Sequence, residues 1–510
     1  MRSKNSIKNI IVNVGSQLFS ILLSFLCRTI FIRTLGEAYL GISGLFSNIL
    51  TLLSLAELGV GTAIIFSMYK PLAQNDRKKI GALMALYKRA YHTIGLIVGI
   101  VGLAFTPFYP LFIKEDPGIP NLTVIYLLYI FNTVITYFFA YKQSIIVADQ
   151  KNYVCTLYQY GFCILQNILQ IAILFQTHNF ILYLCVQILF SFFTNFFLAR
   201  KADQMYPYLR QYEKEKLSKS DRSSILKNIR AMFMHRIGST VVNGTDILLI
   251  SRFVGIVSVG IYSNYFLITS TLRQLTAQIF SGITASVGNL GALEDRKRSY
   301  DIYLSINFAC FWIFSFCSIS LLCLFNPFIT LWTRRQDLLF ALPIVFVIAL
   351  NFFVTGMRQA TLTFRDAFGL FWYDRYKAVL EAAVNLIFSI ILVQRYGIIG
   401  VFAGTFISTM TIDFWVEPLV LFRHGFHRPV RAYFARYVYY AVLTGLTGYF
   451  TYLCCSFLPG AGFWAFAVKC VICLLVPNTV YLVLFWNTRE FQYLKGFVKW
   501  PGSRKSERKA

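Results

Sequence analysis

About fourteen apolar stretches, each long enough for a helix that crosses a membrane, dominate this chain of 510 residues. Such a helix needs about 20 apolar residues, because every backbone polar group in the hydrocarbon must be bonded within the helix. The chain is 57% hydrophobic and 14% charged, whereas soluble domains are about 25% charged. We therefore expect an all-α integral membrane protein, with spans near 10–32, 38–68, 90–113, 121–147, 154–176, 179–199, 230–251, 257–289, 301–332, 338–363, 378–394, 398–421, 434–457 and 464–486.

The basic residues orient these spans. Most of the 48 Lys and Arg residues fall in segments that lie on one side if the N-terminus is cytoplasmic. Because cytoplasmic loops are enriched in Lys and Arg, this bias predicts that both termini are cytoplasmic. It also accounts for much of the net charge of +26 without a nucleic acid partner.

An internal repeat suggests how the spans are grouped. The stretch RTLGEAYLGISGLF at 33–46 aligns with RFVGIVSVGIYSNY at 252–265. At one constant offset the identical pairs are Arg33 and Arg252, Gly36 and Gly255, Gly41 and Gly260, and Ile42 and Ile261. Both copies are expected in the outside turn that follows the first span of a half, which predicts two parallel halves of six helices.

This plan predicts four parts. They are an N-terminal lobe with helices 1–6 (1–200), a cytoplasmic linker (201–229), a C-terminal lobe with helices 7–12 (230–425), and helices 13–14 with a basic cytoplasmic tail (426–510). Within the tail, residues 489–500 mix basic and aromatic side chains. This segment is predicted either to lie along the inner membrane surface or to be a solvated tail.

Polar side chains share single faces of several predicted spans. The first span carries Asn13, Gln17, Ser20, Ser24 and Arg28 on one stripe, and the second carries Ser43, Ser47, Thr51, Ser54, Glu57 and Gly61. The seventh carries His235, Arg236, Ser239, Asn243 and Asp246 on one arc, and the eighth adds Arg273 and Gln274. A charge at the bilayer centre costs roughly 2.5–3.5 kcal/mol on insertion scales. The shared faces therefore predict a hydrophilic, net-cationic cavity inside the protein.

A cationic cavity favours an anionic substrate, since the planar guanidinium group suits phosphate. Surrounding hydroxyl and amide groups suit a sugar; we predict that Asn13, Gln17, Ser24, Ser239, Asn243 and Gln274 contact it. The candidates for ion coupling or charge balance are Glu57, Asp246 and His235. No catalytic residue, metal site or cofactor is expected, and coupling to Na⁺ or H⁺ is left open. The eleven cysteines show neither metal-site spacing nor a disulfide framework, which predicts that they are packing residues.

Four stretches resemble the bacterial polysaccharide repeat-unit flippases of the multidrug/oligosaccharidyl-lipid/polysaccharide exporter superfamily. They are ELGVGTAIIFSMYKPLAQNDRKKI at 57–80, the two repeated turns, and RYGIIGVFAGTFIS at 395–408. The resemblance implies a fourteen-helix, two-lobe MATE-like fold that alternates between inward-open and outward-open states in the bacterial cell membrane. It also implies an undecaprenyl-diphosphate-linked oligosaccharide substrate, whose diphosphate is received by arginines at positions matching Arg28, Arg236 and Arg273. Further implied partners are the polysaccharide polymerase machinery and membrane lipids, for which the last two helices are the implied groove.

Three alternatives stay open at this point. A lipid II flippase, which moves the peptidoglycan precursor, would differ only in the headgroup that it carries. A cation-coupled small-molecule or drug exporter of the same fold would place an acidic residue on the first helix, and this sequence has none there. An enzyme that polymerises or ligates lipid-linked sugars would need a large outside loop for its catalytic residues. Because every predicted outside loop is short, we expect a transporter and not an enzyme.

Overall fold

The computed structural model describes residues 22–57, 60–212, 215, 217–293, 296–370, 373–458, 460 and 462–498. For some residues inside these ranges, chiefly on α9 and the second half of α10, only the backbone is described. Throughout the described ranges the secondary structure is helical and no strand is found. The chain divides into two compact units, residues 1–263 and residues 264–510.

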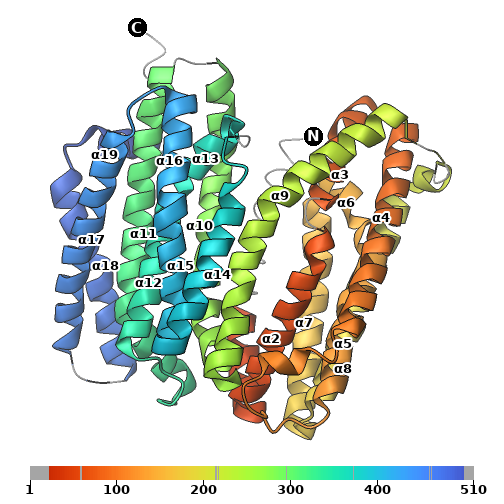
Figure 1. Ribbon diagram of the computed structural model, residues 1–510, viewed down its shortest axis with the longest axis horizontal. Helices are drawn as coiled ribbons and strands as arrows, with labels where there is room; N and C mark the ends of the chain where they lie inside the picture. The colour runs from red at the N-terminus through yellow and green to blue at the C-terminus, as the bar shows by residue number, and fades with distance from the viewer. Residues whose placement is uncertain are drawn as a thin grey trace. The chain divides into compact units, whose positions relative to one another are not determined.

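Unit 1 begins its described part with a helix at residues 22–35. The elements that follow are α2 (Glu37–Leu53), η1 (Ser54–Glu57), α3 (Val60–Gln74), α4 (Arg77–Ala104), η2 (Tyr109–Phe112), α5 (Leu122–Ala140), α6 (Gln143–Ala148), α7 (Asn152–Thr177), α8 (Phe180–Met205), η3 (Pro207–Arg210), α9 (Lys219–Leu249) and η4 (Ile250–Val254). The first turns of α10 (Ile256–Leu293) also belong to this unit. Within it, α5 packs against α4 and α8, and α7 packs against α8 (Figure 1).

Unit 2 contains the remainder of α10. Its further elements are α11 (Arg296–Thr333), α12 (Leu342–Met357), α13 (Gln359–Ala367), α14 (Lys377–Tyr396), α15 (Ile398–Ser408), η6 (Thr409–Asp413), α16 (Phe414–Val420), η7 (Leu421–Phe426), α17 (Arg431–Ser456), α18 (Phe463–Phe485) and α19 (Arg489–Val498). In Figure 1, α17 and α18 lie beside α11, against which both of them pack.

The predicted spans from residue 38 onward correspond to these helices, and the all-α membrane fold is confirmed. Of the first predicted span, 10–32, residues 10–21 lie outside the described residues. Eight helices in the described residues are long and apolar enough to cross a membrane. The second predicted span, 38–68, is two helices, α2 and α3, joined by the short 3₁₀ turn η1. The span predicted at 398–421 contains one π-helical turn, η6, and a second, η7, begins at its last residue. Such turns interrupt regular helices frequently at functional sites.

The start of α9 shows how local chemistry sets a helix boundary. The Ser218 hydroxyl accepts a hydrogen bond from the Asp221 backbone N–H (3.1 Å), which caps the helix. The Asp221 carboxylate in turn accepts one from the Lys79 ammonium group (2.8 Å). The Lys79 ammonium and the Ser218 hydroxyl lower the pKa of Asp221 below its usual range. The polar segment before the seventh predicted span is thereby tied to the first turn of α4.

The two copies of the internal repeat meet each other within unit 1. Gly36 and Gly255 adopt φ of 88° and 136°, the conformations that the turns before α2 and α10 require of a glycine. A Cβ atom added to Gly41 would lie 2.1 Å from the backbone oxygen of Ile256, and one added to Gly260 would lie 2.2 Å from that of Glu37. Glu37 and Ile256 are themselves equivalent positions of the repeat. The contact is therefore reciprocal: each helix presents a glycine to the first carbonyl of the other.

The terminal helices of unit 2 are held onto α11 by aromatic stacking. The rings of Phe311 on α11 and Tyr440 on α17 are 4.1 Å apart and nearly parallel. Trp312 on α11 stacks on Phe491 of α19 with ring centroids 5.7 Å apart. The helical tail is thus packed against the bundle, while its predicted position along a membrane surface stays a prediction.

Candidate functional site

A break between α2 and α3 places an acidic side chain inside unit 1. The hydroxyls of Thr51 and Ser54 each donate a hydrogen bond to the carbonyl four residues earlier, at 2.8 Å. Such bonds compete with the helical pattern and often bend a helix. The helix α2 ends at Leu53, between these two residues, and the chain continues as the 3₁₀ turn η1, whose last residue is Glu57. The side chain of Glu57 therefore extends from this turn and not from a regular α-helix.

Two buried tyrosines hold the Glu57 carboxylate. Tyr91 of α4 donates its hydroxyl hydrogen to Oε1 at 2.6 Å, and Tyr137 of α5 donates to Oε2 at 2.8 Å. Gly61 of α3 leaves room for this arrangement, because a Cβ atom there would lie 2.7 Å from the Tyr87 hydroxyl oxygen and 2.9 Å from that of Tyr91. Each oxygen of the Glu57 carboxylate thus accepts a hydrogen bond from one tyrosine, and each can accept a further hydrogen bond from a ligand.

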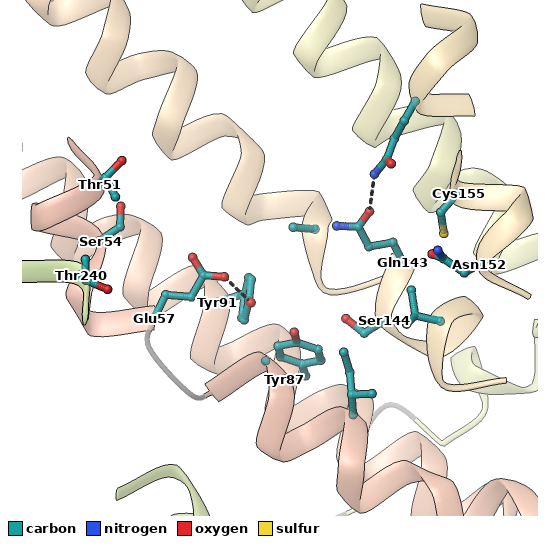
Figure 2. A pocket seen from close by; sticks show the side chains of 15 residues that line it. Thr51, Ser54, Glu57, Tyr87, Tyr91, Gln143, Ser144, Asn152, Cys155 and Thr240 are labelled. Carbon is teal, nitrogen blue, oxygen red and sulfur yellow. Dashed lines mark hydrogen bonds between the residues drawn. The ribbon is translucent and has the colours of Figure 1, made fainter. Parts of the chain in front are cut away.

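A polar cavity of about 570 Å³ opens around this carboxylate (Figure 2). This volume lies in the range of small-ligand sites, about 300–1,000 Å³. The lining is rich in hydroxyl and amide groups: Thr51, Ser54, Tyr87, Tyr91, Ser144, Thr240, Gln143, Asn152 and Gln159. Glu57 is the one charged residue among the described residues that line it. The arrangement offers many hydrogen-bond donors and acceptors around a single negative charge.

Removing the carboxylate is expected to destabilise unit 1. In Glu57→Ala the hydroxyls of Tyr91 and Tyr137 lose their acceptor, and each buried unsatisfied group costs about 1–3 kcal/mol. Glu57→Gln keeps one acceptor oxygen and should be milder. The check is the thermal unfolding midpoint of the purified protein in detergent, with Tyr137→Phe as a variant that removes one donor and leaves the carboxylate. A midpoint for Glu57→Ala equal to that of the wild type would contradict the role given to these bonds.

The polar face predicted for the second span agrees with the cavity in part. Thr51, Ser54, Glu57 and Gly61 line it, whereas Ser43 and Ser47 are not among its lining residues. The sequence did not identify the cavity residues Tyr87 and Tyr91 on α4, because tyrosines in apolar helices are typical of the interfacial belts. It also did not identify the lining residues on α6 and α7. The spacing of Tyr87 and Tyr91, one helical turn apart on α4, was the available signal.

The other predicted site residues are distributed over unit 1 and the helix α10. Arg28, half-buried, donates a hydrogen bond to the backbone oxygen of Ser263 at 3.0 Å. Ser24 is exposed, as are Arg273 and Gln274 on α10, and Asp246 is half-buried on α9. Asn13 and Gln17 lie outside the described residues, and the side chains of His235, Arg236, Ser239 and Asn243 lie outside the described part of α9. The net-cationic cavity stays a prediction.

A buried cluster of charges lies in unit 2. Arg358, where α12 meets α13, donates two hydrogen bonds to the Glu417 carboxylate at 2.7 and 3.0 Å, and its guanidinium lies 2.7 Å from Asp413. Lys377, at the start of α14, lies 3.2 Å from Asp413 and also contacts Glu417. Asp413 and Glu417 are fully buried, each 0% exposed. The positive charges of Arg358 and Lys377 thus balance the negative charges of Asp413 and Glu417. A third carboxylate, that of Glu381, lies 4.0 Å from Arg358.

Unit 2 also has an apolar cavity of about 660 Å³. Its walls come from α11, α12, the end of α15 with η6, and α17. Residues that line it include Ile319, Leu322, Phe346, Phe353, Met410 and Tyr449. Among its described lining residues none is charged, so it suits hydrocarbon and not a polar headgroup.

The helical fold and its apolar spans define a multi-pass membrane protein with the fold of MATE and MurJ transporters. A structure of the lipid II flippase MurJ in an inward closed conformation is similar, with a TM-score of 0.68 and 17% identity over 94% of this chain and 99% of that one. An inward-facing multidrug resistance MATE family transporter of the MOP superfamily has a TM-score of 0.63 and 14% identity over 81% and 97%. A MATE transporter of Vibrio cholerae has a TM-score of 0.55 and 14% identity over 83% and 99%. Identities this low show the fold alone.

The sequence match is confined to the N-terminal part of the chain. Residues 14–173 match the MatE family, so this part carries a MatE domain. No curated protein matches the chain.

Proposed function

We propose that the chain is a flippase. It moves undecaprenyl-diphosphate-linked oligosaccharide repeat units from the cytoplasmic to the outer leaflet of the bacterial cell membrane, for assembly of surface polysaccharide. The observation that carries this proposal is the polar cavity of unit 1. Its hydroxyl and amide groups can donate to and accept from sugar hydroxyls on every side, and they are built into a fold shared with a lipid II flippase.

The apolar cavity of unit 2 supports a lipid-linked substrate over a small soluble one. A repeat unit on undecaprenol combines a polar headgroup with a long hydrocarbon, and the described residues include a polar cavity in unit 1 and an apolar cavity of similar volume in unit 2. The lipid II flippase also matches more of the chain than the multidrug transporter does, 94% against 81%.

The arginines supply the charge in this proposal. Arg28, Arg236 and Arg273 receive the diphosphate during the transport cycle, and Glu57, Asp246 and His235 are the candidates for ion coupling. The hydrogen bond of Arg28 goes to a neutral backbone carbonyl, which does not cancel the positive charge of the guanidinium. An anionic group can therefore still gain from approaching it.

Native mass spectrometry of the purified protein tests the substrate class. We expect an undecaprenyl-diphosphate oligosaccharide to co-purify, and we expect Arg236→Ala to lose it. A bound peptidoglycan precursor would favour a lipid II flippase instead. Ordinary phospholipid alone would contradict the proposal and favour a small-molecule exporter of the same fold.

The same variant should act in cells. Arg236→Ala is expected to abolish display of the surface polysaccharide while the protein remains in the membrane at its normal level. Arg335→Ala is the matched control, because Arg335 pairs with Asp337 in a loop outside the apolar spans. Wild-type amounts of surface polymer in Arg236→Ala would overturn the role of this arginine.

A further inference from the structure

Three cysteine side chains from three helices meet inside unit 2. Cys323 lies on α11, Cys455 on α17 and Cys473 on α18. Their sulfur atoms all lie within 4.8 Å of one another, and those of Cys455 and Cys473 are 3.9 Å apart. In the described part of the chain, no other group of metal-ligating side chains converges in this way.

The spacing of the sulfur atoms fits a single bound ion. Zinc–thiolate bonds are about 2.3 Å long, and three sulfurs at that distance around one ion in a plane would be about 4 Å apart. The pair Cys455 and Cys473 already has this separation. The sulfur of Cys323 lies within 4.8 Å of both of the others, which is less than 1 Å beyond this spacing.

The three cysteines lie in a buried, mostly apolar environment. Each is at most 6% exposed, and they pack with Ile319, Leu324, Ile472 and Tyr452. Lys469 lies one helical turn before Cys473 on α18, and therefore on the same face of that helix. The site therefore combines soft ligands, a buried environment and one nearby positive charge.

We propose that Cys323, Cys455 and Cys473 form a three-coordinate site for a soft monovalent cation, Cu(I). Soft thiolates select Cu(I) and zinc among the common metals. Zinc is almost always four-coordinate, whereas the described residues supply three ligands, a number that Cu(I) accepts.

The charge balance follows from the same residues. When Cu(I) enters, two of the thiols lose their protons to the solvent and bind as thiolates, and the third binds as a neutral thiol. The complex then carries one negative charge, which the Lys469 ammonium group offsets. A bound ion would link α11 to both α17 and α18. This proposal is independent of the transported substrate.

The experiment is a Cu(I) titration of the full-length protein in detergent, kept reduced with a thiol-free reductant. Bicinchoninate, a coloured Cu(I) chelator, competes for the ion. We expect one Cu(I) per chain to be retained by the wild type and lost in Cys323→Ser, Cys455→Ser and Cys473→Ser. The matched controls are Cys454→Ser and Cys470→Ser, which change neighbouring cysteines on the same two helices and should keep the ion.

X-ray absorption at the copper edge tests the wild type without any substitution. We expect three sulfur neighbours around the copper. Nitrogen or oxygen ligands, or equal loss of copper in the control variants, would overturn the site. So would a disulfide between Cys455 and Cys473 in protein isolated from cells with its thiols blocked at lysis, because that pair would then be redox-active.

Discussion

Gly41→Ala should prevent the normal packing of α2 against the start of α10. The added methyl group would lie 2.1 Å from the backbone oxygen of Ile256, and a carbonyl cannot rotate away as a flexible side chain can. Overpacking of this kind typically costs about 1–3 kcal/mol and sometimes more. Here the cost should lie at or above the upper end, since two helix backbones must separate. We expect a large fall in the amount of monodisperse protein extracted from the membrane, measured by fluorescence-detected size-exclusion chromatography.

Gly161→Ala is the matched control. Gly161 also lies within a helix, α7, and a Cβ atom there meets nothing within 4 Å. Because alanine is favoured over glycine in a helix by about 1 kcal/mol, this variant should be as stable as the wild type or slightly more so. Gly260→Ala should behave like Gly41→Ala, and the double variant should be less harmful than additivity predicts, because one separation relieves both clashes. Equal yields for Gly41→Ala and Gly161→Ala would show that the crossing is not closely packed.

Arg358→Met should be the most destabilising single change in unit 2. It removes the cation that contacts both Asp413 and Glu417 and leaves two fully buried carboxylates sharing Lys377. Breaking a buried ion pair by removing one partner costs about 3–5 kcal/mol, mostly because a charge is left uncompensated. The measurement is the thermal unfolding midpoint in detergent, which should fall sharply.

A double variant distinguishes the loss of charge balance from the loss of packing as the cause of the lower unfolding midpoint. Arg358→Met with Glu417→Gln removes one charge of each sign, so it should recover part of the stability lost in Arg358→Met alone. Arg335→Ala is the surface control: its partner Asp337 lies in a loop with 60% of its side chain exposed, and such pairs contribute little. If the single and double variants unfold at the same temperature, the loss comes from packing and not from unbalanced charge.

The sequence predicted those features that depend on spacing along one helix. The apolar stretches indicated the helices, and the polar face through Thr51, Ser54 and Glu57 indicated one wall of the cavity in unit 1. The repeated glycines at 41 and 260 indicated equivalent turns, although nothing in the pattern showed that the two copies touch.

What the sequence did not predict depends on contacts between distant segments. Asp413 and Glu417 are one turn apart, but their cations come from Arg358 and Lys377 on other helices. The three converging cysteines likewise have no metal-site spacing, because each comes from a different helix. Such groups become visible only when tertiary packing is known, since their sequence separation is set by the length of intervening spans.

The reciprocal glycine contact has the form of an isologous interface. In a symmetric homodimer, position i of one subunit meets position j of the other, and j meets i in return. Gly41 with Ile256 and Gly260 with Glu37 obey this rule inside a single chain. The two copies of the repeat therefore meet inside one chain as two subunits of a symmetric dimer would. Since both glycines lie at one crossing, a larger side chain at either of them separates the same two helices.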